Sequence, residues 1–323
     1  MNPPLQPPLP LPAVVIGGYL GAGKTTLVNH LLRHAGGRRI AVLVNDFGEI
    51  NIDAELIEGG SALAGEVLSL AGGCICCSFG ADLVGALARL QQRRPRPDLV
   101  LIETSGVGLP AAVARTAKLA PGMRIEGIVV LADASLLRRQ AAERYVGETV
   151  RQQLREADLV LVGKTDLVDA AALAELTAWL REGGLSAPVV PAQFGEVAPE
   201  VVLGLLAVDA DAAPADAGQW HFAPRGLSAA GIAAAARYVA TTRHFEQAVD
   251  VAALGAELVR NGILRAKGLL LDSSGRWQEL HVVGPRVDMR PWRGPSATGT
   301  GVDAAAGAAS AAGRLVTISL RDG

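Results

Sequence analysis

Residues 13–32 read AVVIGGYLGAGKTTLVNHLL, and this stretch decides the fold class. It opens on small and β-branched apolar residues, a pattern that predicts a buried strand. Glycines then interrupt the apolar run, and Leu27, Leu31 and Leu32 recur after them at helical spacing, which predicts an amphipathic helix. A buried strand that turns through glycines into a helix is typical of an α/β fold with a parallel sheet.

The turn inside this stretch fits the phosphate-loop pattern G-x-x-x-x-G-K-[ST] from Gly18 to Thr25 without a gap. In that pattern backbone amides surround a β-phosphate, Lys24 neutralises β- and γ-phosphate oxygens, and Thr25 offers its hydroxyl oxygen to Mg²⁺. A glycine turn without a ligand is the alternative interpretation. We predict a nucleotide site whose phosphate contacts come from Gly18, Gly21, Ala22, Gly23, Lys24, Thr25 and Thr26.

Short apolar runs alternate with helical segments from Ala13 to about Leu206. Most of the runs are continuously apolar, as expected for strands buried on both faces of a parallel sheet. We therefore predict a doubly wound, mostly parallel sheet. The expected strands are 13–18, 39–45, 98–104, 127–133, 158–164 and 187–192, and the expected helices are 24–35, 80–94, 136–157 and 170–182.

A smaller α+β domain is expected to follow. Its predicted helix covers about 246–261, its predicted hairpins come from 263–291, and 314–320 forms a last strand that returns to the sheet. The predicted division of the chain is a Pro-rich tail at 1–12, a nucleotide-binding domain at 13–206, a linker at 207–219 and the smaller domain at 220–323, with a flexible insertion at 294–313.

Composition argues against several classes of partner. The chain has 323 residues, a formal net charge of −2 and 19% charged residues, so it lacks the basic surface of a nucleic-acid or anionic-membrane protein. No apolar run reaches the roughly 18 residues that span a bilayer. The first residues do not resemble a secretory signal. Unpaired cysteines in a chain without an export signal indicate a reducing compartment, and we expect the cytoplasm.

Three later segments lie where a nucleotide-hydrolysing phosphate-loop protein needs them. Glu103 ends a predicted strand and would reach Mg²⁺ through water, and the amide of Gly106 would contact the γ-phosphate. Lys164 and Asp166 follow another strand, where the lysine stem would cover a guanine ring and the carboxylate would accept from its N1 and N2. The amide of Ala192, after the next strand, would meet the guanine carbonyl.

All three cysteines of the chain fall in residues 70–80, LAGGCICCSFG, as Cys74, Cys76 and Cys77. Thiolates suit Zn²⁺, Cu⁺ or Fe, and three of them in one turn bind one face of a tetrahedral ion. The fourth ligand is left open between Glu49, water, a client residue and a second chain. An incomplete set of ligands favours transfer of the metal over storage. A structural zinc, a redox role and simple packing remain the alternatives.

These segments, in this order, resemble the CobW-type metallochaperone GTPases, relatives of the GTPases that insert nickel into hydrogenase and urease. The resemblance rests on GYLGAGKTTLVNHLL, VNDFGEINID, GGCICCS, ETSG and KTDL, and it covers roughly residues 13–206 and continues into the smaller domain. It implies GTP and Mg²⁺ as cofactors, Zn²⁺ or Co²⁺ at the cysteines, and a role for Asp46 beside Mg²⁺ or the attacking water. The chain departs from the family at Gly163, where Asn, Thr or Ser is common, and it has no histidine-rich stretch.

The leading hypothesis is a slow GTPase, with Lys24, Asp46 and Glu103 as its catalytic residues, that couples GTP to metal delivery. The expected partner is a client metalloprotein or a metal-requiring biosynthetic enzyme, and a homodimer is possible. The alternatives are a small-molecule kinase or ATPase with structural cysteines and a nucleotide-gated zinc sensor. His30 and His34 are expected on a surface face of their helix, and His244 in a packing or solvent role.

Overall fold

The structure is a computed structural model of the chain that describes residues 10–44, 65–69, 79–193, 195–204, 219–220, 237–292 and 312–321. The chain divides into two compact units, which are described separately. The first comprises residues 1–185 and 189–199, and the second comprises 186–188 and 200–323. The predicted linker 207–219 and the insertion 294–313 lie almost wholly outside the described residues.

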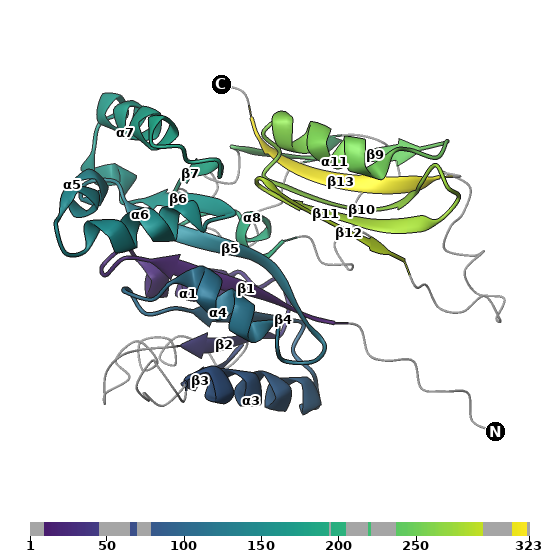
Figure 1. The fold of residues 1–323 in the computed structure, drawn as a ribbon, viewed down its shortest axis with the longest axis horizontal. Helices are drawn as coiled ribbons and strands as arrows, with labels where there is room; N and C mark the ends of the chain where they lie inside the picture. Colours follow the sequence, from purple (N-terminus) through teal and green to yellow (C-terminus); the bar gives the residue numbers. More distant parts are fainter. Residues whose placement is uncertain are drawn as a thin grey trace. The chain divides into compact units, whose positions relative to one another are not determined.

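The first unit is built on a sheet of seven strands, and all of their pairings are parallel (Figure 1). The strand order is β3-β2-β4-β1-β5-β6-β7, with β1 at the centre, so the predicted parallel α/β fold is confirmed. The strands are β1 (Leu11–Gly18), β2 (Ile40–Val44), β3 (Gly65–Ser69), β4 (Leu99–Glu103), β5 (Met123–Asp133), β6 (Leu159–Gly163) and β7 (Val189–Pro191).

The burial of the central strands explains their composition. Every residue of β1, β2, β4 and β6 is buried, which is why these strands are continuously apolar in sequence. The carboxyl ends of parallel strands share one edge of the sheet, and the loops at that edge form the usual ligand site of such folds.

The helices of this unit are α1 (Lys24–Arg33), α3 (Phe79–Gln92), α4 (Pro110–Ala117), α5 (Leu137–Ala142), α6 (Gly147–Arg155), the short 3₁₀ helix η1 (Thr165–Leu167) and α7 (Ala170–Glu182). The single helix expected at 136–157 is wrong, because α5 ends where Glu143 adopts an extended conformation and α6 starts at Gly147. The structure also adds α4, which begins with Pro110 at its first turn, a position that proline favours.

The second unit contains a six-stranded antiparallel sheet in the order β12-β11-β10-β13-β9-β8. Its strands are β8 (Gln219–Trp220), β9 (Tyr238–Phe245), β10 (Arg265–Leu271), β11 (Trp277–Val283), β12 (Arg286–Pro291) and β13 (Gly313–Leu320). The expected hairpins are confirmed as β10–β11 and β11–β12. The last strand does return to the sheet, where it lies between β10 and β9.

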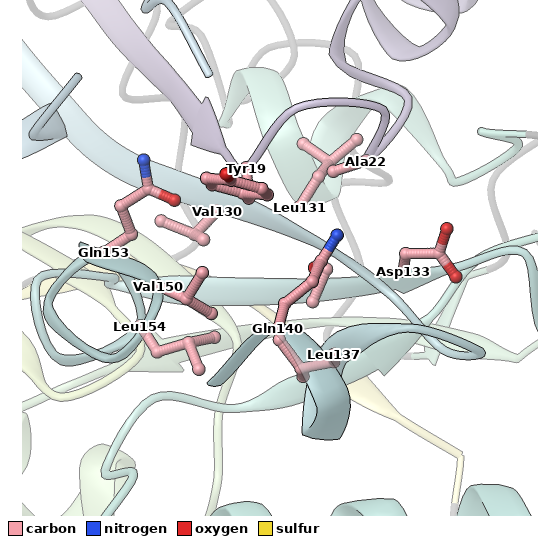
Figure 2. A pocket seen from close by; sticks show the side chains of 11 residues that line it. Tyr19, Ala22, Val130, Leu131, Asp133, Leu137, Gln140, Val150, Gln153 and Leu154 are labelled. Atoms are coloured by element: carbon pink, nitrogen blue, oxygen red, sulfur yellow. The ribbon is translucent and has the colours of Figure 1, made fainter. Parts of the chain in front are cut away.

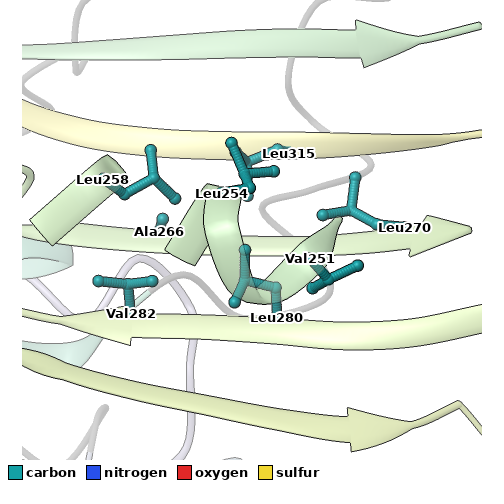
Figure 3. Packing of buried hydrophobic residues seen from close by; sticks show 8 residues of the cluster. All are labelled: Val251, Leu254, Leu258, Ala266, Leu270, Leu280, Val282 and Leu315. Carbon is teal, nitrogen blue, oxygen red and sulfur yellow. The ribbon is translucent and has the colours of Figure 1, made fainter. Parts of the chain in front are cut away.

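The helix α11 (Val251–Arg260) packs on this antiparallel sheet (Figure 3). Its N-cap is Asp250, whose carboxylate accepts from the amide of Ala253 at 2.9 Å. Below it, apolar residues of β10, β11 and β13 complete the core. The core residues are Val251, Leu254, Leu258, Ala266, Leu270, Leu280, Val282 and Leu315.

A short helix, α8 (Pro199–Leu203), is held by Arg265, the first residue of β10. The Arg265 side chain is 1% exposed, and its guanidinium donates to the carbonyl of Val201 at 2.8 Å and to that of Val202 at 2.6 Å. Two charge-assisted bonds to helix-end carbonyls account for an arginine in this interior.

None of the helices in the described part of the chain is long and apolar enough to cross a membrane.

Candidate nucleotide site

The turn between β1 and α1 has the backbone of a phosphate-binding loop. Gly18 has a φ of 136°, and a Cβ added there would lie 2.4 Å from the carbonyl oxygen of Leu131, so only glycine fits. Gly23, the N-cap of α1, has a φ of 97° and no side chain caps the helix. The first amides of α1 are therefore open to an anion, which the helix dipole also favours.

Lys24 and Thr25 are the first residues of α1, and their side chains bind different groups. The Lys24 ammonium donates to the carbonyl of Gly18 at 3.0 Å, so the lysine side chain folds back across the loop. The Thr25 hydroxyl donates to a carboxylate oxygen of Glu103 at 3.3 Å. Both residues are half-buried, whereas Thr26 is exposed and Ala22 is buried.

Glu103 reaches Thr25 because of the sheet register. It ends β4, where it pairs with Ile16 of β1, and its side chain is only 2% exposed. A hydroxyl and a carboxylate at this position are the hard oxygen donors that Mg²⁺ prefers in phosphate-binding sites. The pair therefore fits the ion that the phosphate loop implies.

The segment after β4 lies directly against the phosphate loop. Gly106 is buried, and a Cβ added to it would lie 2.5 Å from Leu20 Cδ2 and 2.8 Å from the Leu20 amide nitrogen. The hydroxyls of Thr104 and Ser105 are also buried, and neither finds a hydrogen-bond partner within the described residues. Sequence reasoning missed these two hydroxyls.

On the other side of the loop, Lys164 is held by Asp133, a residue that the sequence analysis did not select. Lys164 has a φ of 56°, and its ammonium donates to Asp133 Oδ2 at 2.7 Å. Burial by itself raises the pKa of the Asp133 carboxyl, but hydrogen bonds from Lys164 and Ser135 outweigh it and hold that pKa below its usual value. Asp133 is the last residue of β5, just as Glu103 is the last residue of β4. An acidic residue at the end of a predicted strand was therefore the sequence signal that could have identified Asp133.

Asp166 is exposed in η1, where its carboxylate is accessible to a ligand. The amide of Ala192 donates to the carbonyl of Val162 at 2.8 Å and so extends the β6–β7 pairing, and its contact with the guanine carbonyl stays a prediction. The Ala192 carbonyl accepts from the Thr165 hydroxyl at 3.3 Å, which ties the two loops together. At Gly163 an added Cβ would meet only ordinary contacts, the nearest at 3.7 Å from the Ala22 carbonyl.

A small cavity lies behind the phosphate loop, between β5, α5 and α6 (Figure 2). Tyr19 and Ala22 line it from the loop, Asp133 from β5, and Gln140 and Gln153 from the helices. Its volume of about 10 Å³ is at the lower limit for one water molecule. It is therefore too small for a nucleotide.

The histidine pair on α1 is not on a surface face as expected. His30 is 2% exposed, and its Nε2–H donates to the Val197 carbonyl at 2.8 Å, while His34 Nδ1 donates to the His30 carbonyl at 2.8 Å. Burial is the main cause that lowers the pKa of His30, which favours a neutral ring. His30 thus ties α1 to the segment after β7 through a structural contact.

The remaining predicted site residues cannot be placed. Asp46, Glu49, Cys74, Cys76 and Cys77 all lie outside the described residues. His244, on β9, is half-buried, and neither ring nitrogen has a hydrogen-bond partner in the described part of the chain. Within that part no three His, Cys, Asp or Glu residues form a group that would hold a metal ion.

The sequence is similar to that of known proteins. The chain is 33% identical over 224 residues to the zinc chaperone CobW of Sinorhizobium sp, and 35% identical over 232 residues to the zinc chaperone CobW of Pseudomonas aeruginosa. These matches cover 60% and 62% of this chain and 62% of the length of each relative. The crystal structure of the Zn(II)-bound YjiA GTPase from E. coli aligns with a TM-score of 0.47 at 20% identity, covering 97% of this chain and 95% of that one.

The family match covers the unit that carries the phosphate loop. Residues 12–191 match the family described as CobW/HypB/UreG, nucleotide-binding domain. The match is more than half of the chain and spans β1 to β7 except for Leu11, the first residue of β1. With its phosphate loop, its Thr25–Glu103 contact and its parallel sheet in place, the chain belongs to the CobW/HypB/UreG family of nucleotide-binding domains.

Proposed function

We propose that this protein is a GTP-dependent metallochaperone. It binds a transition metal at Cys74, Cys76 and Cys77 and couples GTP binding and slow hydrolysis to delivery of that metal to a client protein. The carrying observation is the Thr25–Glu103 contact at 3.3 Å, which joins the phosphate loop to the strand that precedes Gly106. The zinc chaperones among its relatives support zinc as the cargo, with cobalt as the alternative.

In this proposal the chain's own groups hold and orient GTP. Amides of the phosphate loop bind the β-phosphate, Lys24 neutralises the phosphate oxygens, and the Gly106 amide meets the γ-phosphate. Mg²⁺ at Thr25 and Glu103 would spread the charge of the β- and γ-phosphates. Asp46 positions the attacking water. In this proposal turnover is slow, and a partner would accelerate it.

The sheet topology supports coupling between the two sites. The cysteine-bearing connection leaves the carboxyl end of β3 at Ser69, and the connection that carries Asp46 and Glu49 leaves the same end of β2 at Val44. Parallel strands put these exits on the edge that holds the phosphate loop. Three interstrand spacings separate β3 from β1, or about 14 Å. The proposed client is a metalloprotein or a metal-requiring biosynthetic enzyme in the cytoplasm, and the chaperone would act as a monomer or a homodimer.

The experiment that tests this function is metal analysis of protein purified without oxygen, with and without GTP. We expect about one equivalent of zinc or cobalt per chain and a change in retained metal when GTP is added. A protein that hydrolyses GTP but retains the same metal in every nucleotide state would be a GTPase with a structural metal site.

Guanine recognition gives a separate prediction. Asp166→Asn should weaken GTP binding about 10- to 100-fold, because hydrogen bonds to a charged acceptor are worth roughly 1.5–3 kcal/mol. Xanthosine triphosphate should gain affinity in the same variant, since its oxygen accepts from the new amide. The measurement is a competition titration with GTP, XTP and ATP.

The matched control is Asp169→Asn, three residues further along. Asp169 is exposed and caps α7 by accepting from the Ala172 amide at 2.7 Å, and asparagine caps a helix equally well. This control should leave all three affinities unchanged. Wild-type protein that binds ATP as tightly as GTP would favour the kinase alternative.

A further inference from the structure

One buried glutamine holds the segment that follows β4. Gln153, on α6, is 1% exposed, and its side-chain amide nitrogen donates to the Gly106 carbonyl at 3.1 Å and to the Gly108 carbonyl at 2.8 Å. Both acceptors are backbone oxygens, so the two amide hydrogens of Gln153 are both used. The neighbouring buried positions of α6 include Val150 and Leu154, and a polar side chain among them is tolerated because it is hydrogen-bonded.

The same segment also lies against the phosphate loop. Leu20 lies so close to Gly106 that a Cβ there would overlap it, at 2.5 Å from Leu20 Cδ2. The amide of Gly108 donates to the Ser105 carbonyl at 3.0 Å and closes a tight turn. The turn 105–108 is therefore held by contacts with both Leu20 and Gln153. Figure 2 shows Gln153 beside Tyr19 at the cavity behind the loop.

We propose that Gln153 is a positioning residue for the γ-phosphate, acting through the turn 105–108. Glycine peptides rotate freely, so an unrestrained Gly106 amide would have many directions to point. The two bonds from Gln153 fix the peptides that follow Gly106 and Gly108, and Leu20 lies against Gly106. A donor fixed in advance needs no reorganisation when the charged group arrives.

This inference rests on the proposed function, and it makes a claim of its own about nucleotide choice. GDP has no γ-phosphate and does not need the Gly106 amide. Gln153 should therefore set the preference for GTP over GDP and leave the affinity for GDP alone. A side chain that merely stabilised the fold would affect both nucleotides equally.

The first test is Gln153→Met, which keeps the length of the side chain and removes both donors. We expect affinity for a non-hydrolysable GTP analogue to fall about 5- to 30-fold, a loss typical of two ordinary hydrogen bonds, while GDP affinity stays within about twofold. The control is Gln152→Met on the same helix, where the native amide donates to Glu156 at 3.0 Å. The control should change neither affinity.

The second test is Gln153→Glu, read as a pH profile. The carboxylate would face two carbonyl oxygens and cannot donate, so the preference for the analogue over GDP should be lost at about pH 8. Burial raises the pKa of a carboxyl group, and its protonated form can donate one hydrogen bond. In Gln153→Glu the preference for the GTP analogue over GDP should therefore recover in part as the pH falls to about 5.5. The wild-type protein, measured over the same pH range, is the reference.

The outcomes separate the inference from the proposed function. If wild-type protein binds neither nucleotide, the proposed function fails. If wild-type protein binds both but Gln153→Met changes neither affinity, or lowers both by the same factor, Gln153 is not a positioning residue and the proposed function stands. If Gln153→Met does not fold, the pH profile of Gln153→Glu decides, and a flat profile that matches wild type overturns the inference.

Discussion

Replacing Lys24 with alanine is expected to lower the affinities for GTP and GDP by a factor of about 30 or more. Removing one partner of a buried, hydrogen-bonded charge pair costs roughly 2–5 kcal/mol, and each 1.4 kcal/mol is about tenfold in affinity. Lys24 is the cation that the phosphate loop supplies, and its ammonium already lies across the loop on the Gly18 carbonyl. The rate of GTP hydrolysis should fall as well, because less nucleotide is bound.

The fold should survive this change, because the sheet and its core do not depend on the lysine. Isothermal titration calorimetry with both nucleotides and a thermal melt measure the two effects separately. Lys118→Ala is the control, since Lys118 is an exposed lysine at the end of α4. Unchanged hydrolysis in Lys24→Ala would mean that the nucleotide binds elsewhere.

Cys76→Ser and Cys77→Ser are each expected to abolish tight binding of one metal ion per chain. A serine hydroxyl stays protonated where a thiol becomes a thiolate, so the variant loses a ligand outright. Changes to the second shell of a metal site already cost about 10–100-fold in affinity, and loss of a ligand should cost more. Competition with a chromophoric zinc chelator measures the constant.

The same variants should bind GTP normally in metal-free buffer, because the phosphate loop belongs to a different segment of the chain. Glu49→Ala should weaken the coupling between metal and GTP more than it weakens either ligand alone. Serine variants that retain wild-type zinc affinity would show that the metal has other ligands, and the cysteines would then have a packing or redox role.

The inner strands of the parallel sheet and its edge strand β7 could be predicted from sequence, but β3 and β9 could not. β1, β4 and β6 lie inside the sheet, and their uninterrupted apolar residues report burial on both faces. β3 is an edge strand, and its sequence GEVLS carries too few apolar residues to stand out. In the second unit β9 reads YVATTRHF, where threonines, arginine and histidine hide a strand that is paired on both sides.

Some residues of the candidate site could also be predicted from sequence, and others could not. Thr25 and Glu103 were predicted to share an ion, and the parallel register does bring them together. Asp133 and Gln153 were missed because their roles depend on partners that are distant in sequence, the Lys164 ammonium and the carbonyls of Gly106 and Gly108. The bond from the Ala192 amide to the Val162 carbonyl could not be predicted either, since it depends on how β6 and β7 pair.

The measurement that tests the central claim most directly is the dissociation constant for Zn²⁺ in two nucleotide states, with GDP and with a non-hydrolysable GTP analogue. Coupling between sites is typically about 1–3 kcal/mol, so the two constants should differ roughly 5- to 150-fold. Linkage also requires zinc to change the affinity for the analogue, relative to GDP, by the same factor. Equal zinc constants in the two states would contradict a nucleotide-gated chaperone and would make the cysteines a structural metal site.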